Sequence, residues 1–330
     1  MQKLTGKSVL VTGGAGFIGS HLVDRIAVDK PGNLVVVDNL FLGKESNLDH
    51  AKTLFPDLKF YREDAANYEA MEQIIRQEKV EVIFNLAVIP LPYSLEHPRE
   101  TMAQNMAITS TVVQLLHDKV YKTLIHFSSS EVYGTATHIP QDEYHPLNPS
   151  TPYAASKVAS DYAVLSYCKT FGVDAAIVRP FNNYGPRQNE GSYAGIIPIV
   201  IHKALRGEPV VIYGDGEQTR DYIFVRDVAD GAVRIYEEEA SRGLVVNLAT
   251  GRELSINRLA RTILELMEVD VPIIHEAPRP GDVRRHCGNV GLAYNIIGFQ
   301  SRVLAQDALL ETINWYKEQA KLKEANANLS

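Results

Sequence analysis

The sequence SVLVTGGAGFIGSHLVDRIAV, residues 8–28, decides the fold of this chain. It opens with a short apolar run, typical of a buried strand, and closes with residues spaced as in a helix. Between the two, Gly13, Gly16 and Gly19 form the pattern G-x-x-G-x-x-G. A tight turn here needs small residues, and the backbone amides at the start of the helix can then approach a pyrophosphate. The stretch therefore predicts a strand–turn–helix unit that binds the diphosphate of a dinucleotide.

A second apolar run, residues 34–37, follows this helix and ends at Asp38. An acid about 20 residues beyond the glycines bonds the adenosine ribose and repels a 2′-phosphate, which favours NAD over NADP. A glycine motif alone would also fit an ordinary turn between a strand and a helix. Strand, glycines, helix, second strand and acid together indicate an NAD site.

The alternation of strand and helix patterns continues beyond Asp38. Helices are expected at 69–79, 99–119 and from Tyr153 onward, and further strands at 60–64, 82–87, 124–127 and 175–178. Repeated β-α units predict an α/β protein with a Rossmann-type, doubly wound parallel sheet.

Two places in this series leave alternatives open. Asp64, at the end of the strand pattern 60–64, either bonds the adenine of the cofactor or caps the next helix. The apolar stretch 88–94 contains Pro90 and Pro92, and two prolines exclude a regular helix there. This stretch forms either a wall of the substrate pocket or plain packing.

Polar residues follow the apolar strand pattern at 124–127. In an open parallel sheet, ligands bind beyond the carboxyl ends of the strands. The side chains of Ser129, Ser130 and Glu131 are expected at such an end, facing a crevice.

A tyrosine and a lysine open the helix that comes next. Tyr153 and Lys157 are four residues apart, so both side chains lie on one face of the helix. An ammonium group beside a phenol favours the phenolate and lowers its pKa. The pair is a candidate proton shuttle at a substrate hydroxyl.

The pattern of strands and helices changes after residue 187, where turns become frequent and the predicted strands become shorter. We expect an NAD-binding domain at 1–175, with 221–248 packing back onto it, and a smaller C-terminal α/β lobe at 176–330. A single surface arginine is usually only solvated, but several in the loops of one lobe suit a diphosphate. The arginines in predicted loops of this lobe are Arg187, Arg220, Arg279, Arg284 and Arg285.

The composition is that of a globular protein, with 330 residues, 45% hydrophobic and 22% charged, and a net charge of −7. This charge argues against a nucleic-acid surface. Cys168 and Cys287 give no disulfide framework and fit a reducing compartment. We find no signal peptide before the glycine-rich run, no apolar stretch of about 18 residues and no metal site, so we expect a cytoplasmic protein without a membrane partner.

Several motifs together resemble those of the extended short-chain dehydrogenase/reductases that act on nucleotide sugars. The resemblance covers nearly the whole chain and rests on TGGAGFIG at 12–19, VVVDN at 35–39, SSSEVYG at 128–134, YAASK at 153–157, RPFNNYGPRQ at 179–188 and GDGEQTRDYIFVRD at 214–227. It implies an enzyme that holds NAD tightly, recycles it within each turnover and binds a nucleotide-diphosphate sugar.

The matching positions imply roles for individual residues. Tyr153 would take the proton of the sugar 4-hydroxyl as hydride leaves C4, and Ser129 would bond the same oxygen. Contacts with the substrate are implied for Ser94, Asn182, Arg187, Arg220 and Arg279. Contacts with the cofactor are implied for Gly13, Gly16, Phe17, Ile18, Gly19, Asp38, Asn39, Asp64, Ala65, Leu86, Ala87, Asn105, Tyr153 and Lys157.

The resemblance also has one departure and one consequence for assembly. Asn85 stands where many members carry His before the Leu-Ala pair, which loosens the detail of the cofactor pocket. The family usually forms homodimers through two long helices, here near 101–118 and 153–170.

Three reactions of the family share oxidation at C4. A 4-epimerase then only returns hydride to the keto-sugar. A 4,6-dehydratase needs a base at C5 and expels the C6 hydroxyl. A uronate decarboxylase starts from a uronic acid and needs a cation for its carboxylate, for which Arg284 and Arg285 are candidates.

Glu131 separates these reactions, because simple epimerases generally lack an acid there whereas dehydratases and uronate decarboxylases carry one. The trio Ser129-Ser130-Glu131 lacks the Asp that usually protonates the C6 leaving group in dTDP-glucose dehydratases, and protonated Glu131 would then serve. We expect a 4,6-dehydratase, with a UDP-glucuronate decarboxylase or a 4-epimerase as alternatives. Glu131 could also be purely structural. A non-catalytic NAD-sensing binding protein is a further hypothesis, although such proteins typically lose the Tyr/Lys pair.

Overall fold

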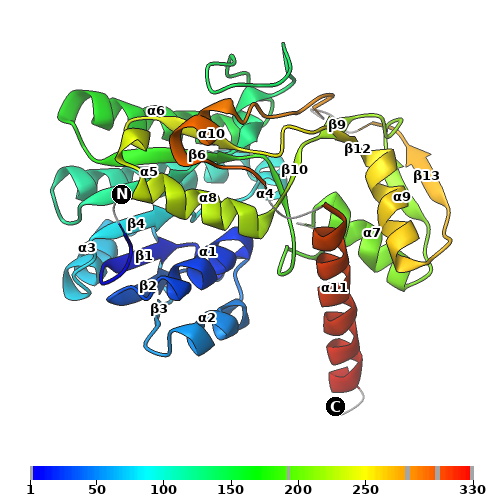
Figure 1. Ribbon diagram of the computed structural model, residues 1–330, viewed down its shortest axis with the longest axis horizontal. Coiled ribbons are helices and arrows are strands. Elements are labelled where there is room, and N and C mark those ends of the chain that lie inside the picture. The colour runs from blue at the N-terminus through cyan, green and yellow to red at the C-terminus, as the bar shows by residue number, and fades with distance from the viewer. Residues whose placement is uncertain (1–2, 192–193, 279–282, 302–304, 328–330) are drawn as a thin grey trace.

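The computed structural model describes residues 3–191, 194–278, 283–301 and 305–327, and its main feature is a parallel sheet (Figure 1). The sheet has seven strands in the order β11-β6-β5-β4-β1-β2-β3, which confirms the doubly wound α/β fold. The strands are β1 (Ser8–Thr12), β2 (Asn33–Val37), β3 (Lys59–Tyr61), β4 (Val82–Asn85), β5 (Thr123–Phe127), β6 (Ala175–Pro180) and β11 (Val245–Leu248).

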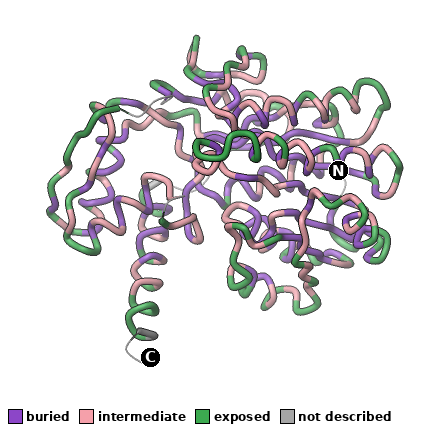
Figure 2. Tube along the Cα trace, turned by 180° about the vertical axis from the view of Figure 1, so that it is seen from behind, coloured by how far each residue is buried: buried purple, intermediate pink, exposed green. Residues whose placement is uncertain are grey.

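Both faces of the sheet are covered by helices, so its inner strands are apolar throughout. Successive residues of β1 face opposite sides: Val9 and Val11 belong to one core and Leu10 to the other. The first core is closed by α1 (Phe17–Val28) and α8 (Val225–Glu237). The second is closed by α3 (Tyr68–Gln77), α5 (Pro98–His117) and α6 (Pro152–Phe171). Figure 2 shows the buried strands inside and the exposed residues on outer loops and helix ends.

The C-terminal half adds a smaller lobe with its own core, at the right of Figure 1. Its apolar residues include Ile201, Ile212, Ile263 and Ile313, all fully buried or nearly so. The elements are β7 (Asn182–Tyr184), α7 (Ile196–Leu205), β8 (Val210–Tyr213), β9 (Thr219–Arg220), β10 (Tyr222–Phe224), β12 (Leu254–Ser255), α9 (Ile256–Met267), β13 (Ile273–Glu276) and α11 (Ala305–Ala327).

Segments from the second half of the chain also return to the large sheet. Strand β6 pairs with β5, and β11 pairs with β6 at the edge of the sheet. Helix α8 packs against α1, and α10 (Gly291–Ile297) packs against β11 and α8. The sequence-based boundary at residue 175 therefore falls at the first residue of a sheet strand, and we keep the division into two functional parts as a proposal.

One expectation about local structure was wrong. The stretch 88–94 was expected to contain no regular helix, yet α4 spans Leu91–Glu96. Its two prolines are tolerated because Pro90 is the N-cap and Pro92 lies in the first turn, where backbone N–H groups have no partner inside the helix.

The long helices α5, α6 and α11 have 20, 20 and 23 residues. None of the helices in the described part of the chain is both long enough and apolar enough to cross a membrane. The far end of α11 extends away from the rest of the molecule (Figure 1).

Candidate active site

The glycine-rich turn brings the backbone of β1, α1 and β4 close together. Gly13 has a φ of +65°, and a Cβ added to it would lie 2.8 Å from the amide nitrogen of Ala87. A Cβ on Gly19 would lie 2.1 Å from the carbonyl oxygen of Gly13. Helix α1 begins after Gly16 without a side-chain cap, so its N-terminus is open to an anion. The turn therefore fits the diphosphate role predicted from the sequence.

Asp38 directly follows β2 beside this turn and is buried. Its carboxylate accepts hydrogen bonds from the amides of Ala15, at 3.0 Å, and Leu40, at 2.8 Å. Burial raises the pKa of Asp38 above its usual value, and these amide hydrogen bonds oppose the shift only in part. The amides hold the carboxylate at the rim of the glycine turn, where a ribose would lie.

A cavity runs along the carboxyl edge of the sheet and collects nearly all the predicted cofactor residues. Its lining includes Gly13, Gly16, Phe17, Ile18, Gly19, Asp38, Asn39, Asp64, Ala65, Leu86, Ala87, Tyr153 and Lys157. Residues not anticipated from the sequence also line it, among them Phe41, Leu42, Gln104, Ile108, Ser128, Pro180 and Asn189.

The alternative that Asp64 caps the next helix is wrong. Helix α3 is capped by Asn67, whose side chain accepts from the amide of Ala70. Asp64 instead accepts two hydrogen bonds from Gln104 Nε2, at 3.0 and 2.7 Å, and lines the cavity. Gln104 stands on α5, 40 residues away in the chain, so no local sequence signal could have indicated it.

Asn105 and Ser94, both predicted as contact residues, do not line the cavity. Asn105, expected at the cofactor, is buried and bonds Ile89 through both its oxygen, at 2.7 Å, and its nitrogen, at 3.2 Å. It also donates to Ser156 Oγ and so ties the segment after β4 to α6. Ser94, expected at the substrate, is fully buried and donates to the carbonyl of Leu91 within α4.

Tyr153 and Lys157 stand in the first turns of α6 and line the cavity, as predicted. Thr151 caps this helix by accepting from the amide of Ala154, at 3.1 Å, and Pro152 occupies its first position. Lys157 Nζ donates to the carbonyl oxygen of Phe127 at the end of β5. The helix start is thus fixed against the strand that carries the polar trio.

The trio itself forms the start of η2 (Ser130–Tyr133), a short 3₁₀ helix. Ser129 caps it and also shares a hydrogen bond with the side chain of Tyr153. Glu131 lies near enough for its charge to act on Tyr153. Ser130 is buried, and its backbone carbonyl is bonded to the ring of His286. Ser129 and Glu131 therefore both lie next to Tyr153, but they are not among the residues that line the cavity.

The expected lowering of the pKa of Tyr153 is not found. Burial raises the pKa of Tyr153 to about 12; the hydrogen bond with Ser129 opposes this, and the charges of Glu131 and Asp161 add to it. Burial also lowers the pKa of Lys157 to about 8. The ammonium group of Lys157 is directed to the Phe127 carbonyl, so it does not offset the burial of the phenol.

A buried ion pair lies one turn beyond Lys157. Asp161 Oδ2 accepts from Ser128 Oγ, at 2.8 Å, and from Arg179 Nη2, at 2.6 Å. Arg179 also donates to the hydroxyl of Tyr133, the last residue of η2. Consecutive turns of α6 thus hold residues 127 and 128, and the same network reaches η2.

Asn85, where the sequence departs from the resemblance, is buried at the end of β4. Its oxygen accepts from Thr12 Oγ1, at 2.6 Å, and its nitrogen contacts His126 Nδ1, at 3.1 Å. Thr12 Oγ1 in turn accepts from the amides of Leu86 and Ala87, which line the cavity. Asn85 therefore links three neighbouring strands below the cavity.

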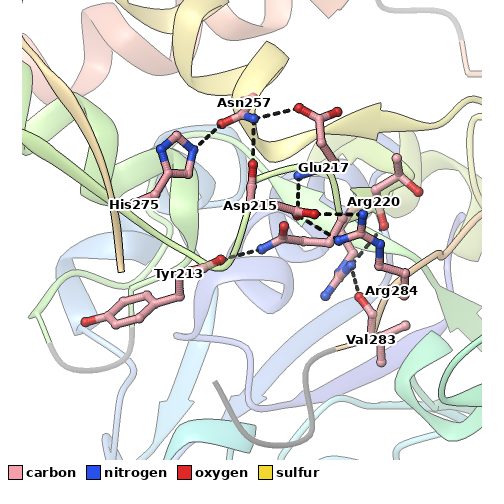
Figure 3. Close-up of polar contacts among 10 residues, drawn as sticks. Tyr213, Asp215, Glu217, Arg220, Asn257, His275, Val283 and Arg284 are labelled. Carbon is pink, nitrogen blue, oxygen red and sulfur yellow. Dashed lines mark hydrogen bonds and ion pairs between the residues drawn. The ribbon is translucent and has the colours of Figure 1, made fainter. Parts of the chain in front are cut away.

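The arginines of the C-terminal half are more constrained than expected. Arg187 is paired with Asp24 of α1, at 2.8 Å, and Arg220 donates to the carbonyls of Thr219 and Val283. Arg284 forms a bidentate salt bridge with Asp215, with N···O distances of 2.7 and 3.0 Å (Figure 3).

Arg285 forms a bidentate salt bridge with Glu253. Asn182, on β7, has a buried side-chain oxygen with no hydrogen-bond partner in the described residues. Arg279 lies outside the described residues.

Comparison with known proteins decides the family. The profile of the NAD dependent epimerase/dehydratase family matches residues 9–249, which is more than half of the chain. The chain belongs to this family. The cofactor of the family is NAD, and the glycine turn, the open start of α1 and the buried Asp38 fit it.

Members with different reactions are similar to this chain over nearly its whole length. A UDP-glucose 4-epimerase of Mycolicibacterium smegmatis is 34% identical over 94% of this chain and 99% of its own length. A UDP-N-acetyl-alpha-D-glucosaminuronate decarboxylase of Bacillus cytotoxicus is 31% identical over 94% and 98%. The dTDP-glucose 4,6-dehydratase DesIV of Streptomyces venezuelae, solved with NAD bound, is 30% identical, with a TM-score of 0.87 over 94% and 97%. The family is therefore shown and the individual reaction is not.

The role of Asp38 gives a testable preference between cofactors. We expect tight binding of NAD and binding of NADP weaker by about 10²-fold, because the 2′-phosphate would meet a buried carboxylate. Asp38→Asn, which removes the charge and keeps an acceptor oxygen for one of the two amides, Ala15 at Oδ2 or Leu40 at Oδ1, should narrow the difference in affinity to less than about tenfold. Calorimetric titration of both dinucleotides measures it, and equal affinities in the wild type would contradict the assignment.

Proposed function

We propose that this protein is an NAD-dependent nucleotide-sugar 4,6-dehydratase. The observation that supports this best is the acid of η2: Glu131 lies two residues after the cap Ser129, and its charge acts on Tyr153. We call Ser129 and η2 together the catalytic turn. Oxidation at C4 requires only Tyr153, its serine partner and the cofactor. A carboxylate next to them supplies the extra base that removal of the C5 proton demands.

The first step uses residues that surround the cavity. Tyr153, bonded to Ser129, contacts the sugar 4-hydroxyl and receives its proton as the phenolate; the positive charge of bound NAD would favour this form against the burial that raises the pKa of Tyr153. NAD, when bound, would supply the hydride acceptor for C4 and the hydride donor for C6. Lys157, fixed to the Phe127 carbonyl, orients the cofactor and Tyr153 at the end of β5. The product of this step is a ketone at C4, which acidifies the proton on C5.

The second step belongs to Glu131. Its carboxylate takes the C5 proton, and the resulting acid gives that proton to the C6 hydroxyl, which leaves as water. The product is completed by the hydride that the cofactor would return to C6 and by a proton from solvent at C5. The net change is loss of one water molecule from the nucleotide sugar.

The nucleotide diphosphate is proposed to bind between the cavity and the C-terminal lobe. The side-chain oxygen of Asn182 is buried and has no hydrogen-bond partner among the described residues. Arg220 is the last residue of β9 in the C-terminal lobe. Arg187 and Arg279 stay predictions for this role, as does the assignment of the whole lobe to the substrate.

We also propose a homodimer through α5 and α6, supported by Tyr162, which exposes 61% of its surface on α6. A solution mass of one chain by light scattering would exclude the dimer.

A 4-epimerase is the second candidate, favoured by the 34% identity to a UDP-glucose 4-epimerase. It leaves Glu131 without a chemical role. A uronate decarboxylase would use Glu131, but it also needs a cation for the carboxylate. Its candidate holders Arg284 and Arg285 are each paired with a carboxylate already.

The mass of the product separates these reactions. We expect purified protein supplied with UDP-N-acetylglucosamine, dTDP-glucose and GDP-mannose to release a product lighter by one water from at least one of them. UDP-glucuronate in the same panel tests for loss of carbon dioxide, and an unchanged mass with a new sugar configuration identifies an epimerase. The dehydratase proposal fails if none of the hexose nucleotides loses water.

A further inference from the structure

Residues 283–289 cross from the C-terminal lobe to the catalytic turn. In the C-terminal lobe, the side chain of Arg284 forms a salt bridge with Asp215. The backbone carbonyl of Arg284 accepts a hydrogen bond from the amide of Thr219, at 3.0 Å. Arg220 donates to the carbonyl of Val283, as Figure 3 shows. These contacts fix the start of the segment to the turn between β8 and β9.

The other end of the segment is fixed to the loop that follows η2. The amide of Gln141 donates to the carbonyl of Cys287, and the amide of Asn289 donates to the carbonyl of Gln141, both at 2.8 Å. The amide of Gly288 also donates to the buried carboxylate of Asp221, at 3.2 Å. The segment is therefore bonded on both sides, and His286 lies in its middle.

His286 is fully buried and contacts both Ser130 and Phe181. Its Nε2 lies 3.0 Å from the carbonyl oxygen of Ser130, and its ring packs against Phe181 at 4.9 Å between centroids. A carbonyl oxygen only accepts, so Nε2 carries the proton and Nδ1 does not. Burial and the charge of Arg220 lower the pKa of His286 to about 4, so the ring is neutral at physiological pH.

We propose that His286 is a positioning residue that fixes the catalytic turn, and with it Glu131, relative to the lobe that binds the nucleotide. The reason is proximity: Ser130 directly precedes Glu131, and a 3₁₀ helix of four residues has few hydrogen bonds of its own. Displacement of a catalytic group by about 1 Å can cost about 10²-fold in rate. The inference rests on the proposed function, because it concerns the group that takes the C5 proton.

The test compares His286→Phe, which removes the donor but keeps a ring against Phe181, with His286→Gln, which keeps an N–H donor. His138→Phe is the matched control, because His138 is exposed in the loop after η2 and does not contact Ser130. Each variant with NAD bound is mixed with the hexose nucleotide that the wild type dehydrates, in deuterated water. Nicotinamide absorbance reports oxidation at C4, and mass spectrometry reports deuterium at C5.

For His286→Phe we expect C4 oxidation within about threefold of the wild type and C5 exchange slower by about 10–100-fold. His286→Gln should recover most of the exchange, and His138→Phe should match the wild type in both steps. Should the Phe variant not fold, His286→Met fills similar volume without a donor and carries the same comparison.

Unchanged exchange in the donor-free variant overturns the inference, and so does an equal fall of both steps together with weaker NAD binding, which marks a purely structural residue. A wild-type enzyme that shows no exchange at C5 instead refutes the proposed function on which the inference depends.

Discussion

Tyr153→Phe is expected to oxidise the substrate at C4 about 10²–10⁴-fold more slowly than the wild type, because it removes the group that receives the 4-hydroxyl proton. The hydroxyl that it deletes is bonded to Ser129 and stands at the cavity. The aromatic ring remains, so folding and NAD binding should not change. A single-turnover measurement of nicotinamide absorbance, with the substrate identified in the product screen, gives the rate.

Tyr167→Phe is the matched control for this variant. Tyr167 stands on the same helix, and its hydroxyl donates to Gln114 at 2.9 Å, away from the cavity lining. Its oxidation rate should equal that of the wild type. Comparable rates for Tyr153→Phe and Tyr167→Phe would remove Tyr153 from the mechanism.

Glu131→Gln is expected to stop the reaction after its first step. The amide keeps the shape and hydrogen bonding of the side chain but does not accept the C5 proton, and loss of such a base typically costs about 10²–10⁴-fold. Oxidation at C4 depends on Tyr153 and should survive. Reduced cofactor and keto-sugar should then accumulate, seen as nicotinamide absorbance that rises and stays.

Deuterated water and a matched control make this result specific. The wild type should place deuterium at C5 of the product and Glu131→Gln should not, whereas Glu100→Gln, an exposed acid on α5, should behave as the wild type. In an epimerase C5 does not exchange, and the substitution at Glu131 would matter little. Full dehydration by Glu131→Gln would show that another group takes the C5 proton.

The sequence predicted the sheet and most of the cavity because both depend on local patterns. The glycines, the acid after β2, and the helical spacing of Tyr153 and Lys157 are each visible within a short stretch. The cavity forms where the ends of these parallel strands meet, so residues at strand ends were found together.

The errors come from contacts between distant parts of the chain. Gln104 donates hydrogen bonds to Asp64 from a helix 40 residues further along the chain. The salt bridge of Arg187 with Asp24 joins the two halves of the chain. The pKa of Tyr153 depends on burial, which spacing along a helix does not reveal. The prolines of α4 misled for another reason, because their effect depends on their position within the helix and not on their number.

The pairing of β11 with β6 bears on how this chain can be dissected. The strand at the edge of the cofactor sheet is made of residues 245–248, and α8, which covers one face, is made of residues 225–237. A truncated chain ending at 175 would leave β5 as an unpaired edge and would uncover the apolar residues beneath α8. Residues 1–175 alone are therefore not expected to fold, and chimaeras with other family members should exchange β6, α8 and β11 together.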